Sequence, residues 1–171
     1  MSYYLEYGNK KAKCIELKIN PKVPFPKIVQ SITRIGIAGC SKAELIHYAV
    51  LELVSNSVRS HLEKNVQENI HVILSIQEEK LTVNVEDRGG GFNPAVLPYD
   101  ITFDPDSIDV NSETFQKYRE HHNYSRFGMG LLSAKRTFPE LKIQFVTQKG
   151  VVTSWSEAVI GTYISGELYL K

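Results

Sequence analysis

The chain has 171 residues, of which 42% are hydrophobic and 23% charged, and its formal net charge at pH 7 is +1. This composition is that of an ordinary globular domain that can bury a core, and the near-neutral charge gives no reason to expect a nucleic-acid or membrane partner. The sequence has no long apolar run and no basic start, so neither a membrane-spanning helix nor a signal peptide is expected. Its two cysteines lack metal-ligand spacing, which is typical of reduced thiols in a cytoplasmic protein.

The first third of the chain is predicted to hold a strand and two helices. Residues 12–19 alternate between polar and apolar side chains, which predicts a half-buried strand. Apolar residues at helical spacing from Lys27 predict a helix that ends near residues 36–39. The sequence Ser41-Lys-Ala-Glu44 has the form of a capping box and predicts the start of a second helix, which should reach about Glu63.

This second helix is apolar almost all round, which predicts that it is buried on most sides. Glu52 and Asn56 lie within it, and buried polar groups need partners. These two residues are therefore conspicuous.

The remainder of the chain alternates between strand patterns and one long connection. Residues 70–77 and 80–86 predict a hairpin. Residues 93–127 form a long segment that we expect to be polar and aromatic-poor, with little apolar area, of the kind that makes functional lids. Short helices are predicted at 112–121 and 131–138, followed by strands at 141–147, 150–156 and 161–170. Because the strands come in hairpin groups, we predict a single domain of the α+β class over residues 1–171: a two-layer α/β sandwich with one mixed, mainly antiparallel sheet and helices on one face.

Three short motifs carry the chemistry. In Glu52-Leu-Val-Ser-Asn56, a carboxylate and a carboxamide four residues apart share one helix face. In Asp87-Arg-Gly-Gly-Gly91, an acid at a strand end precedes glycines that let a ligand approach the backbone. In Gly128-Met-Gly-Leu131, glycines open a helix whose free N–H groups suit a phosphate.

This order of motifs resembles the N, G1 and G2 boxes of the GHKL ATPase superfamily, which contains gyrase, Hsp90, histidine kinases and MutL. The resemblance runs from about Glu44 to Thr162 and is greatest to the stand-alone anti-sigma-factor serine/threonine kinases, through Gly91-Phe-Asn-Pro94 and the Arg-x-Gly-Met-Gly pattern at Arg126. It implies the Bergerat fold, ATP and Mg²⁺ as cofactors, and a nucleotide lid at about 93–127. Ser60 departs from the pattern, since these kinases tend to carry a histidine there.

The resemblance implies a role for each motif residue. Asp87 would accept a hydrogen bond from the adenine amine, Gly89 and Gly91 would leave room for the purine, and the Thr162 hydroxyl would reach the base through water. Asn56 would be the Mg²⁺ ligand, and Glu52 the catalytic base or its orienter. The simpler alternatives are an Asp-Gly turn, a capping Asn and a surface Glu.

The phosphate contacts are expected from the third motif and two arginines. The backbone of Gly128, Met129, Gly130 and Leu131 would bind phosphate, and Arg126 would neutralise the γ-phosphate. Arg59 shares the helix stripe of Glu52 and Asn56, at a spacing where histidine kinases often carry a phosphate-binding lysine. For both arginines an exposed, solvated position is the alternative.

The function expected from the resemblance is an ATP-dependent serine/threonine kinase. Its protein substrate would be an anti-sigma-factor antagonist in a partner-switching module; a sigma factor is a further candidate partner, and a homodimer is compatible with the resemblance. Two alternatives stay open: a non-catalytic binding module whose surface ATP switches, and a histidine kinase-like ATPase acting in trans.

Overall fold

The computed structural model describes residues 2–123 and 128–171 of the chain. Within these residues it has the strands β1 Tyr4–Tyr7, β2 Lys10–Ala12, β3 Cys14–Ile19, β4 Ile35–Ala38, β5 Ile70–Gln77, β6 Lys80–Glu86, β7 Glu140–Thr147, β8 Gly150–Val152 and β9 Gly161–Tyr169. The α-helices are α1 Phe25–Thr33, α2 Ala43–Glu63, α3 Glu113–His121 and α4 Gly130–Thr137, and two short 3-10 helices are η1 Pro94–Val96 and η2 Pro105–Ser107.

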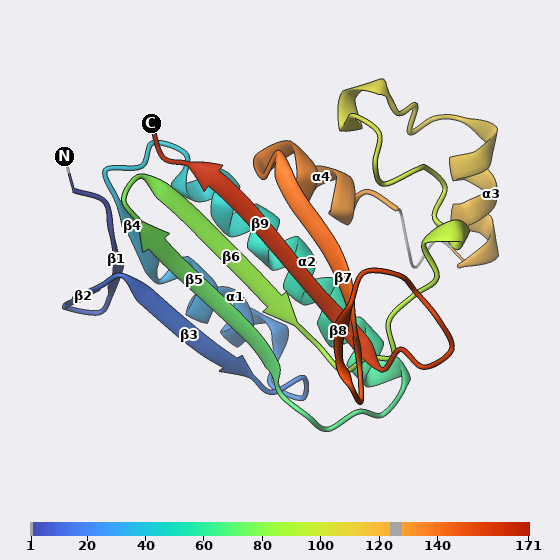
Figure 1. The fold of residues 1–171 in the computed structure, drawn as a ribbon, viewed down its shortest axis with the longest axis horizontal. Helices are drawn as coiled ribbons and strands as arrows, with labels where there is room; N and C mark the ends of the chain where they lie inside the picture. The colour runs from blue at the N-terminus through green and yellow to red at the C-terminus, as the bar shows by residue number, and fades with distance from the viewer. Residues whose placement is uncertain (1, 124–127) are drawn as a thin grey trace.

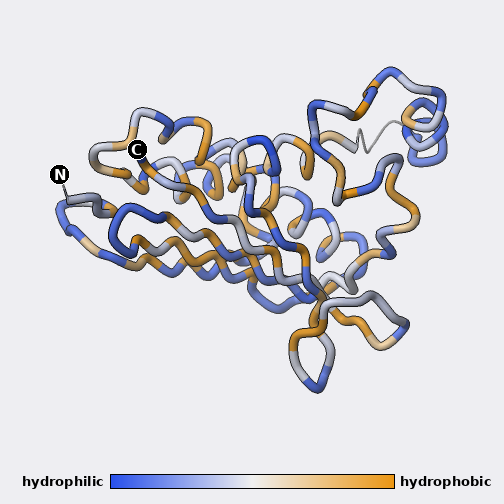
Figure 2. The backbone as a smooth tube through the Cα atoms, turned by 45° about the horizontal axis from the view of Figure 1, so that its top comes forward, coloured by the Kyte–Doolittle hydropathy of each residue, from blue (hydrophilic) through white to orange (hydrophobic). Residues whose placement is uncertain are grey.

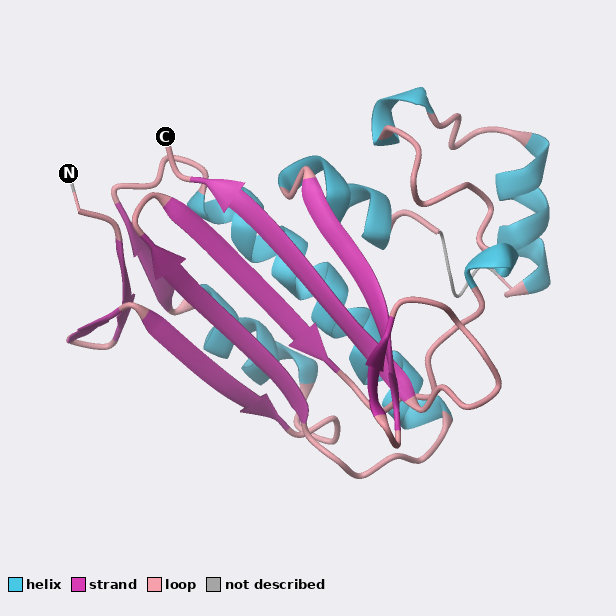
Figure 3. Ribbon diagram, in the orientation of Figure 1, coloured by secondary structure: helices cyan, strands magenta, loops and turns pink. Residues whose placement is uncertain are grey.

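The fold is a two-layer sandwich. A six-stranded sheet in the order β3-β5-β6-β9-β7-β8 forms one layer, and α1, α2 and α4 cover one of its faces (Figure 1). The connection between β6 and α4, with α3, lies beyond the β7 side of the sandwich (Figure 3). The predicted α+β sandwich is thereby confirmed.

The core lies between the sheet and α2. In β5 and β6 the residues facing the helices are buried and the alternate ones are half-exposed or exposed, as the period of two in the sequence predicts. Figure 2 shows this alternation of hydrophobic and hydrophilic residues along the strands. The hairpin of β5 and β6 turns at Glu78 and Glu79, as predicted.

The sheet differs from the prediction in two respects. Every strand pair in the described residues is antiparallel, so the six-stranded sheet is not mixed. A second sheet of order β2-β1-β4 stands beside it and was not predicted. Its strands have only three or four residues, too few for a period of two to emerge from the sequence.

The predicted helix from Lys27 was wrong at both ends. Helix α1 begins at Phe25, with Pro24 at the N-cap and Pro26 in the first turn, and it ends at Thr33. Proline suits the first helical turn, where an amide hydrogen has no partner in the helix. Ile35, which continues the apolar spacing of Ile28 and Ile32, is instead a buried residue of β4.

Helix α2 has the predicted length, but its start and surroundings differ from expectation. It begins at Ala43, with Lys42 at the N-cap and no side-chain capping bond, so the capping box at Ser41 does not form. Leu45 and Tyr48 are 57% and 68% exposed. One stripe of the N-terminal half of α2 therefore faces away from the core, and the helix is not buried on most sides there.

The boundaries of two predicted strands also differ from the structure. The strand predicted at 12–19 is interrupted at Lys13, which separates β2 from β3. The strand predicted at 150–156 ends at Val152, so β8 pairs with β7 over three residues only. The helices predicted near 112–121 and 131–138 are present as α3 and α4.

Candidate functional site

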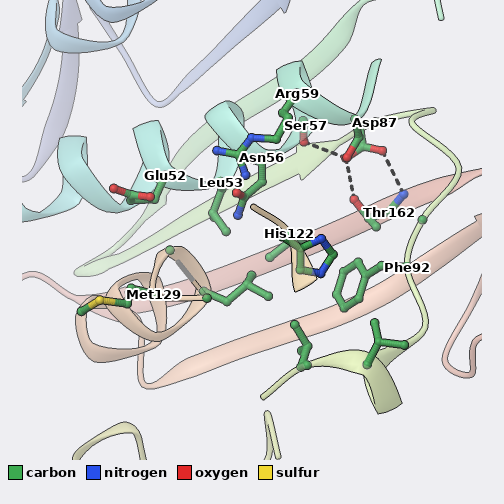
Figure 4. A pocket seen from close by; sticks show the side chains of 18 of the residues that line it. Glu52, Leu53, Asn56, Ser57, Arg59, Asp87, Phe92, His122, Met129 and Thr162 are labelled. Carbon is green, nitrogen blue, oxygen red and sulfur yellow. Dashed lines mark hydrogen bonds between the residues drawn. The ribbon is translucent and has the colours of Figure 1, made fainter. Parts of the chain in front are cut away.

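A cavity of about 600 Å³ lies where α2, the ends of β6 and β9, the start of α4 and the β6–α4 connection meet. The three sequence motifs converge on it, although they lie far apart in the chain (Figure 4). The predicted site residues that line it are Glu52, Asn56, Arg59, Asp87, Gly91, Gly128, Met129, Gly130, Leu131 and Thr162. Two predicted residues are not among them, namely Gly89, which packs elsewhere, and Arg126, which lies outside the described residues.

One end of the cavity is built around a buried carboxylate. Asp87 follows β6 directly and is 5% exposed. The hydroxyls of Ser57 on α2 and Thr162 on β9 each donate to its Oδ2 at 2.7 Å (Figure 4). Its Oδ1 accepts from the amides of Gly89, at 2.9 Å, and Thr162, at 3.3 Å. These four bonds offset the cost of burying the charge and fix the direction of the carboxylate.

The backbone beside Asp87 is packed too closely for side chains at two glycines. A Cβ on Gly161 would lie 1.8 Å from the Asp87 carbonyl oxygen. A Cβ on Gly91 would lie 2.4 Å from a Val159 methyl, and the φ of Gly91 is +64°, a backbone conformation that favours glycine. The absence of a side chain at Gly91 thus lets Val159 pack against the backbone at the cavity wall, while room for a purine beside Gly91 stays a prediction.

Gly89 has a different role from the predicted one. It does not line the cavity; its Cβ position is 2.5 Å from the Ser60 Cβ and 3.2 Å from the His61 ring. The absence of a side chain there lets the turn after β6 lie directly on α2. Gly89 thus provides room for a helix rather than for a ligand.

The other end of the cavity carries the polar face of α2. A Cβ on Gly130 would lie 2.9 Å from Glu52 Oε2 and 3.3 Å from Asn56 Nδ2, so both side chains reach the first residue of α4. The first amides of a helix have no partner within it, and the helix dipole favours negative charge at this point. Glu52 and Ser57 are about 7.5 Å apart along α2, since a helix rises about 1.5 Å per residue.

The cavity is also lined by residues that were not predicted, among them Ser57, Phe92, Tyr118 and His122. Ser57 stands next to Asn56 in the sequence, and its own signal was only that adjacency. Phe92, Tyr118 and His122 line the wall formed by the connection between β6 and α4. Figure 4 shows Phe92 and His122 at the cavity together with the motif residues. Phe92 belongs to the Gly91-Phe-Asn-Pro94 pattern, whereas Tyr118 and His122 are brought to the cavity by the packing of α3, which no local pattern could identify.

The connection between β6 and α4, expected to be polar and aromatic-poor, has an apolar cluster of its own. Phe115 on α3 is fully buried and stacks on Tyr99, with ring centroids 5.6 Å apart. Gly128 packs against Phe115 and Pro98, and burial raises the pKa of the Tyr99 hydroxyl. The prediction of a long connection is confirmed; the expectation that it has little apolar area was wrong.

Two basic side chains of α4 also bind this connection. The Lys135 ammonium donates to the carbonyl oxygens of Ile101 and, at 2.7 Å, Phe103. Arg136 pairs with Asp106 at 3.3 Å. Hence α4 contacts both the cavity, through Gly130, and the connection, through two basic side chains.

The side-chain oxygens at the α4 end of the cavity are of the kind that a hard divalent cation takes as ligands. Asn56 and Glu52 offer carbonyl and carboxylate oxygens, which Mg²⁺ prefers. Among the described residues, no group of three His, Cys, Asp or Glu side chains is placed to hold a metal by itself. A Mg²⁺ ion here would therefore need oxygens from a ligand or water to complete its shell.

Residues 41–165, most of the chain, match the family model of the histidine kinase-, DNA gyrase B- and HSP90-like ATPases. The match spans all three motifs and the cavity they form. The chain belongs to this ATPase family. No curated protein matches the chain, and none of the helices in the described part is long and apolar enough to cross a membrane. ATPase domains of this GHKL type bind ATP, typically with Mg²⁺.

Proposed function

We propose that this GHKL protein is a serine/threonine kinase of the anti-sigma-factor type, which transfers the γ-phosphoryl group of ATP to an antagonist protein in a partner-switching module. The observation that carries the proposal is the placement of Glu52. Its carboxylate adjoins Asn56 and the first residue of α4, at the opposite end of the cavity from Asp87. A base at the phosphate end is what a hydroxyl acceptor requires.

The adenine would bind at Asp87. The four hydrogen bonds to this carboxylate fill its acceptor positions. An exocyclic amine would therefore replace one of the two hydroxyl donors, Ser57 or Thr162, which would turn toward a ring nitrogen or water. A base without that amine would leave the site imperfectly paired, which is how such sites discriminate.

The triphosphate would bind between α2 and the start of α4. The backbone of Gly128, Met129, Gly130 and Leu131 would donate to phosphate oxygens, with Arg59 as a neighbouring cation on the cavity wall. Arg126 precedes this motif in the sequence and would neutralise the γ-phosphate. Asn56 would hold Mg²⁺, which when bound neutralises charge that develops on the phosphates.

Glu52 would accept the proton of the attacking serine or threonine hydroxyl. As this happens, the hydroxyl oxygen bonds to the γ-phosphorus, and the bond between the γ-phosphorus and the departing ADP oxygen breaks. The base contributes less than positioning in phosphoryl transfer, because the transition state is loose. The glycines and α4 therefore do most of the work by fixing the phosphates.

The test is incubation of the protein with Mg²⁺ and γ-labelled ATP, together with candidate antagonist proteins from the same genome. The proposal expects label on serine or threonine of one antagonist, as measured by phosphoamino-acid analysis, and none when the Glu52→Gln variant is used over the same time. Label on histidine would favour a histidine kinase-like ATPase acting in trans. ATP binding without transfer or hydrolysis would favour a nucleotide-gated binding module.

A further inference from the structure

His61 is a fully buried polar residue that neither the motifs nor the proposed chemistry uses. It lies on the last turns of α2, one helical turn beyond Ser57, and its exposed fraction is 0%. Its Nε2 accepts a hydrogen bond from the backbone amide of Arg88 at 2.9 Å. Arg88 directly follows Asp87, so α2 forms two hydrogen bonds here, from Ser57 to the Asp87 carboxylate and from the Arg88 amide to His61.

The bond to Arg88 fixes the tautomer of the imidazole. A backbone amide only donates, so Nε2 must be unprotonated and the ring proton must be on Nδ1. Nδ1 is buried and has no hydrogen-bond partner among the described residues. The hydrogen bond to the Arg88 amide therefore leaves the Nδ1–H group of His61 buried without a partner among the described residues, which costs folding free energy.

The amide that His61 pairs belongs to a turn held from two sides. On the β9 side, the amides of Asp87 and Gly90 donate to the carbonyls of Thr162, at 3.0 Å, and Ile160, at 2.9 Å. On the α2 side, the hydrogen bond from Arg88 to His61 is joined by the close packing of Gly89 on Ser60 and the His61 ring. Since Arg88 N shares a peptide with Asp87, its position sets the position of the Asp87 backbone.

We propose that His61 is a positioning residue for the base-recognition turn, defined as residues 87–91. Its neutral imidazole holds the Arg88 amide and keeps the Asp87 carboxylate aimed into the cavity, and it thereby sharpens the preference for adenine over guanine nucleotides. The inference rests on the proposed adenine contact of Asp87. It extends base recognition beyond the three motifs to the C-terminal end of α2.

The first test uses the wild-type protein. Long-range ¹H–¹⁵N NMR correlations at neutral pH should show His61 with a proton on Nδ1 and none on Nε2. A proton on Nε2, or on both nitrogens, would overturn the inference, because neither form accepts from Arg88.

The second test compares His61→Gln, whose side-chain oxygen can accept in place of Nε2, with His61→Leu, which fills space and cannot accept. Val72→Ala, a substitution at a fully buried residue of β5, is the control for a general loss of stability. In His61→Leu, the Arg88 amide should exchange with solvent at least about tenfold faster, and ATP affinity should fall about tenfold, in line with the loss of one hydrogen bond at a buried amide. His61→Gln should bring both the exchange rate of the Arg88 amide and the ATP affinity most of the way back to the wild-type values. GTP affinity should change little in either His61 variant. Val72→Ala should leave ATP affinity and the preference for ATP over GTP unchanged.

The outcomes separate this inference from the proposed function. Unchanged Arg88 exchange in His61→Leu, or equal losses of ATP affinity in the Leu and Gln variants, would overturn the positioning role while an Asp87→Asn loss of affinity left the adenine contact standing. Unchanged ATP affinity in Asp87→Asn would overturn both.

Discussion

At the scale of single residues, the cavity divides into two ends with different chemistry. Asp87 is buried and accepts four hydrogen bonds, whereas Glu52 and Asn56 lie against Gly130, the first residue of α4. The first arrangement suits a fixed acceptor for a base, and the second suits a charged group that arrives with a ligand. Substitutions at the two ends should therefore affect different steps.

Asn56→Ala should weaken binding of Mg-ATP far more than binding of metal-free ADP. The side chain removed offers an oxygen to the metal and not to the base. Isothermal titration calorimetry with and without Mg²⁺ measures the difference, and we expect it to exceed about tenfold, or about 1.4 kcal/mol. Equal weakening of both nucleotides would make Asn56 structural and place the metal elsewhere.

Glu52→Gln should leave nucleotide binding within about threefold of wild type and slow phosphoryl transfer by about a hundredfold or more, because only the base is removed. Single-turnover transfer to a working protein substrate measures the rate. Glu44→Gln, a change at the first turn of the same helix, is the matched control and should transfer at the wild-type rate. A wild-type rate in Glu52→Gln would remove Glu52 from the chemistry.

At the scale of elements, α4 links the cavity to the connection between β6 and α4. Gly130 faces Glu52 and Asn56, and one turn later Lys135 and Arg136 hold carbonyl groups and Asp106 of the connection. A ligand that fixes the start of α4 would thus also restrain residues 101–106. This contact provides a physical route from phosphate binding to closure of a lid.

Lys135→Ala should loosen that connection without unfolding the sandwich, because it frees two carbonyl groups and leaves the core intact. Hydrogen exchange followed by mass spectrometry should show less protection at residues 100–108 and unchanged protection in α2 and β5. Lys117→Ala is the control, since Lys117 is an exposed lysine of α3 that pairs with Glu113 of the same helix.

Adding Mg²⁺ and a non-hydrolysable ATP analogue should raise protection of 100–108 in wild type and raise it less in Lys135→Ala. Equal protection in the two proteins with the analogue bound would mean that α4 does not carry the coupling.

The sequence predicted elements best where a single local pattern decides the structure. The β5–β6 hairpin, α2, α3, α4 and β9 follow from hydrophobic period, turn residues and length. The predictions of the capping box at Ser41 and of the end of α1 were wrong because the same residues are compatible with more than one backbone conformation. Tertiary contacts decide which one forms. Ile35 continues a helical spacing but pairs in a strand with Tyr7.

The candidate site was predictable to the extent that it lies in motifs. Asp87, Asn56, Glu52 and Gly130 converge on one cavity as the motif order predicts. His61 and His122 could not be found in this way, since each reaches the site through packing between elements distant in sequence. Gly89 lies near the site as predicted, but it packs against Ser60 and His61 of α2 and not against the cavity where a purine would bind.

At the scale of the whole molecule, the sandwich separates a stable platform from a ligand-facing edge. The six-stranded sheet and α2 bury the main core, and the cavity opens where the ends of β6 and β9 meet α2 and α4. The outer face of the sheet carries polar residues such as Thr82, Asn84 and Ser165 on adjacent strands. The core thus fixes Asp87, while the described part of the connection to α4 supplies another wall of the cavity.

The central claim is that this cavity binds ATP through Asp87, and calorimetric titration of ATP and GTP into wild type and Asp87→Asn tests it most directly. We expect wild type to prefer ATP over GTP, and Asp87→Asn to lose at least about tenfold in ATP affinity, about 1.4 kcal/mol, because a neutral amide is a weaker acceptor than a carboxylate. Glu167→Gln, which neutralises a carboxylate of β9 paired with Lys80, should bind ATP as wild type does. Equal affinity of wild type for ATP and GTP, or undiminished ATP binding by Asp87→Asn, would contradict the account.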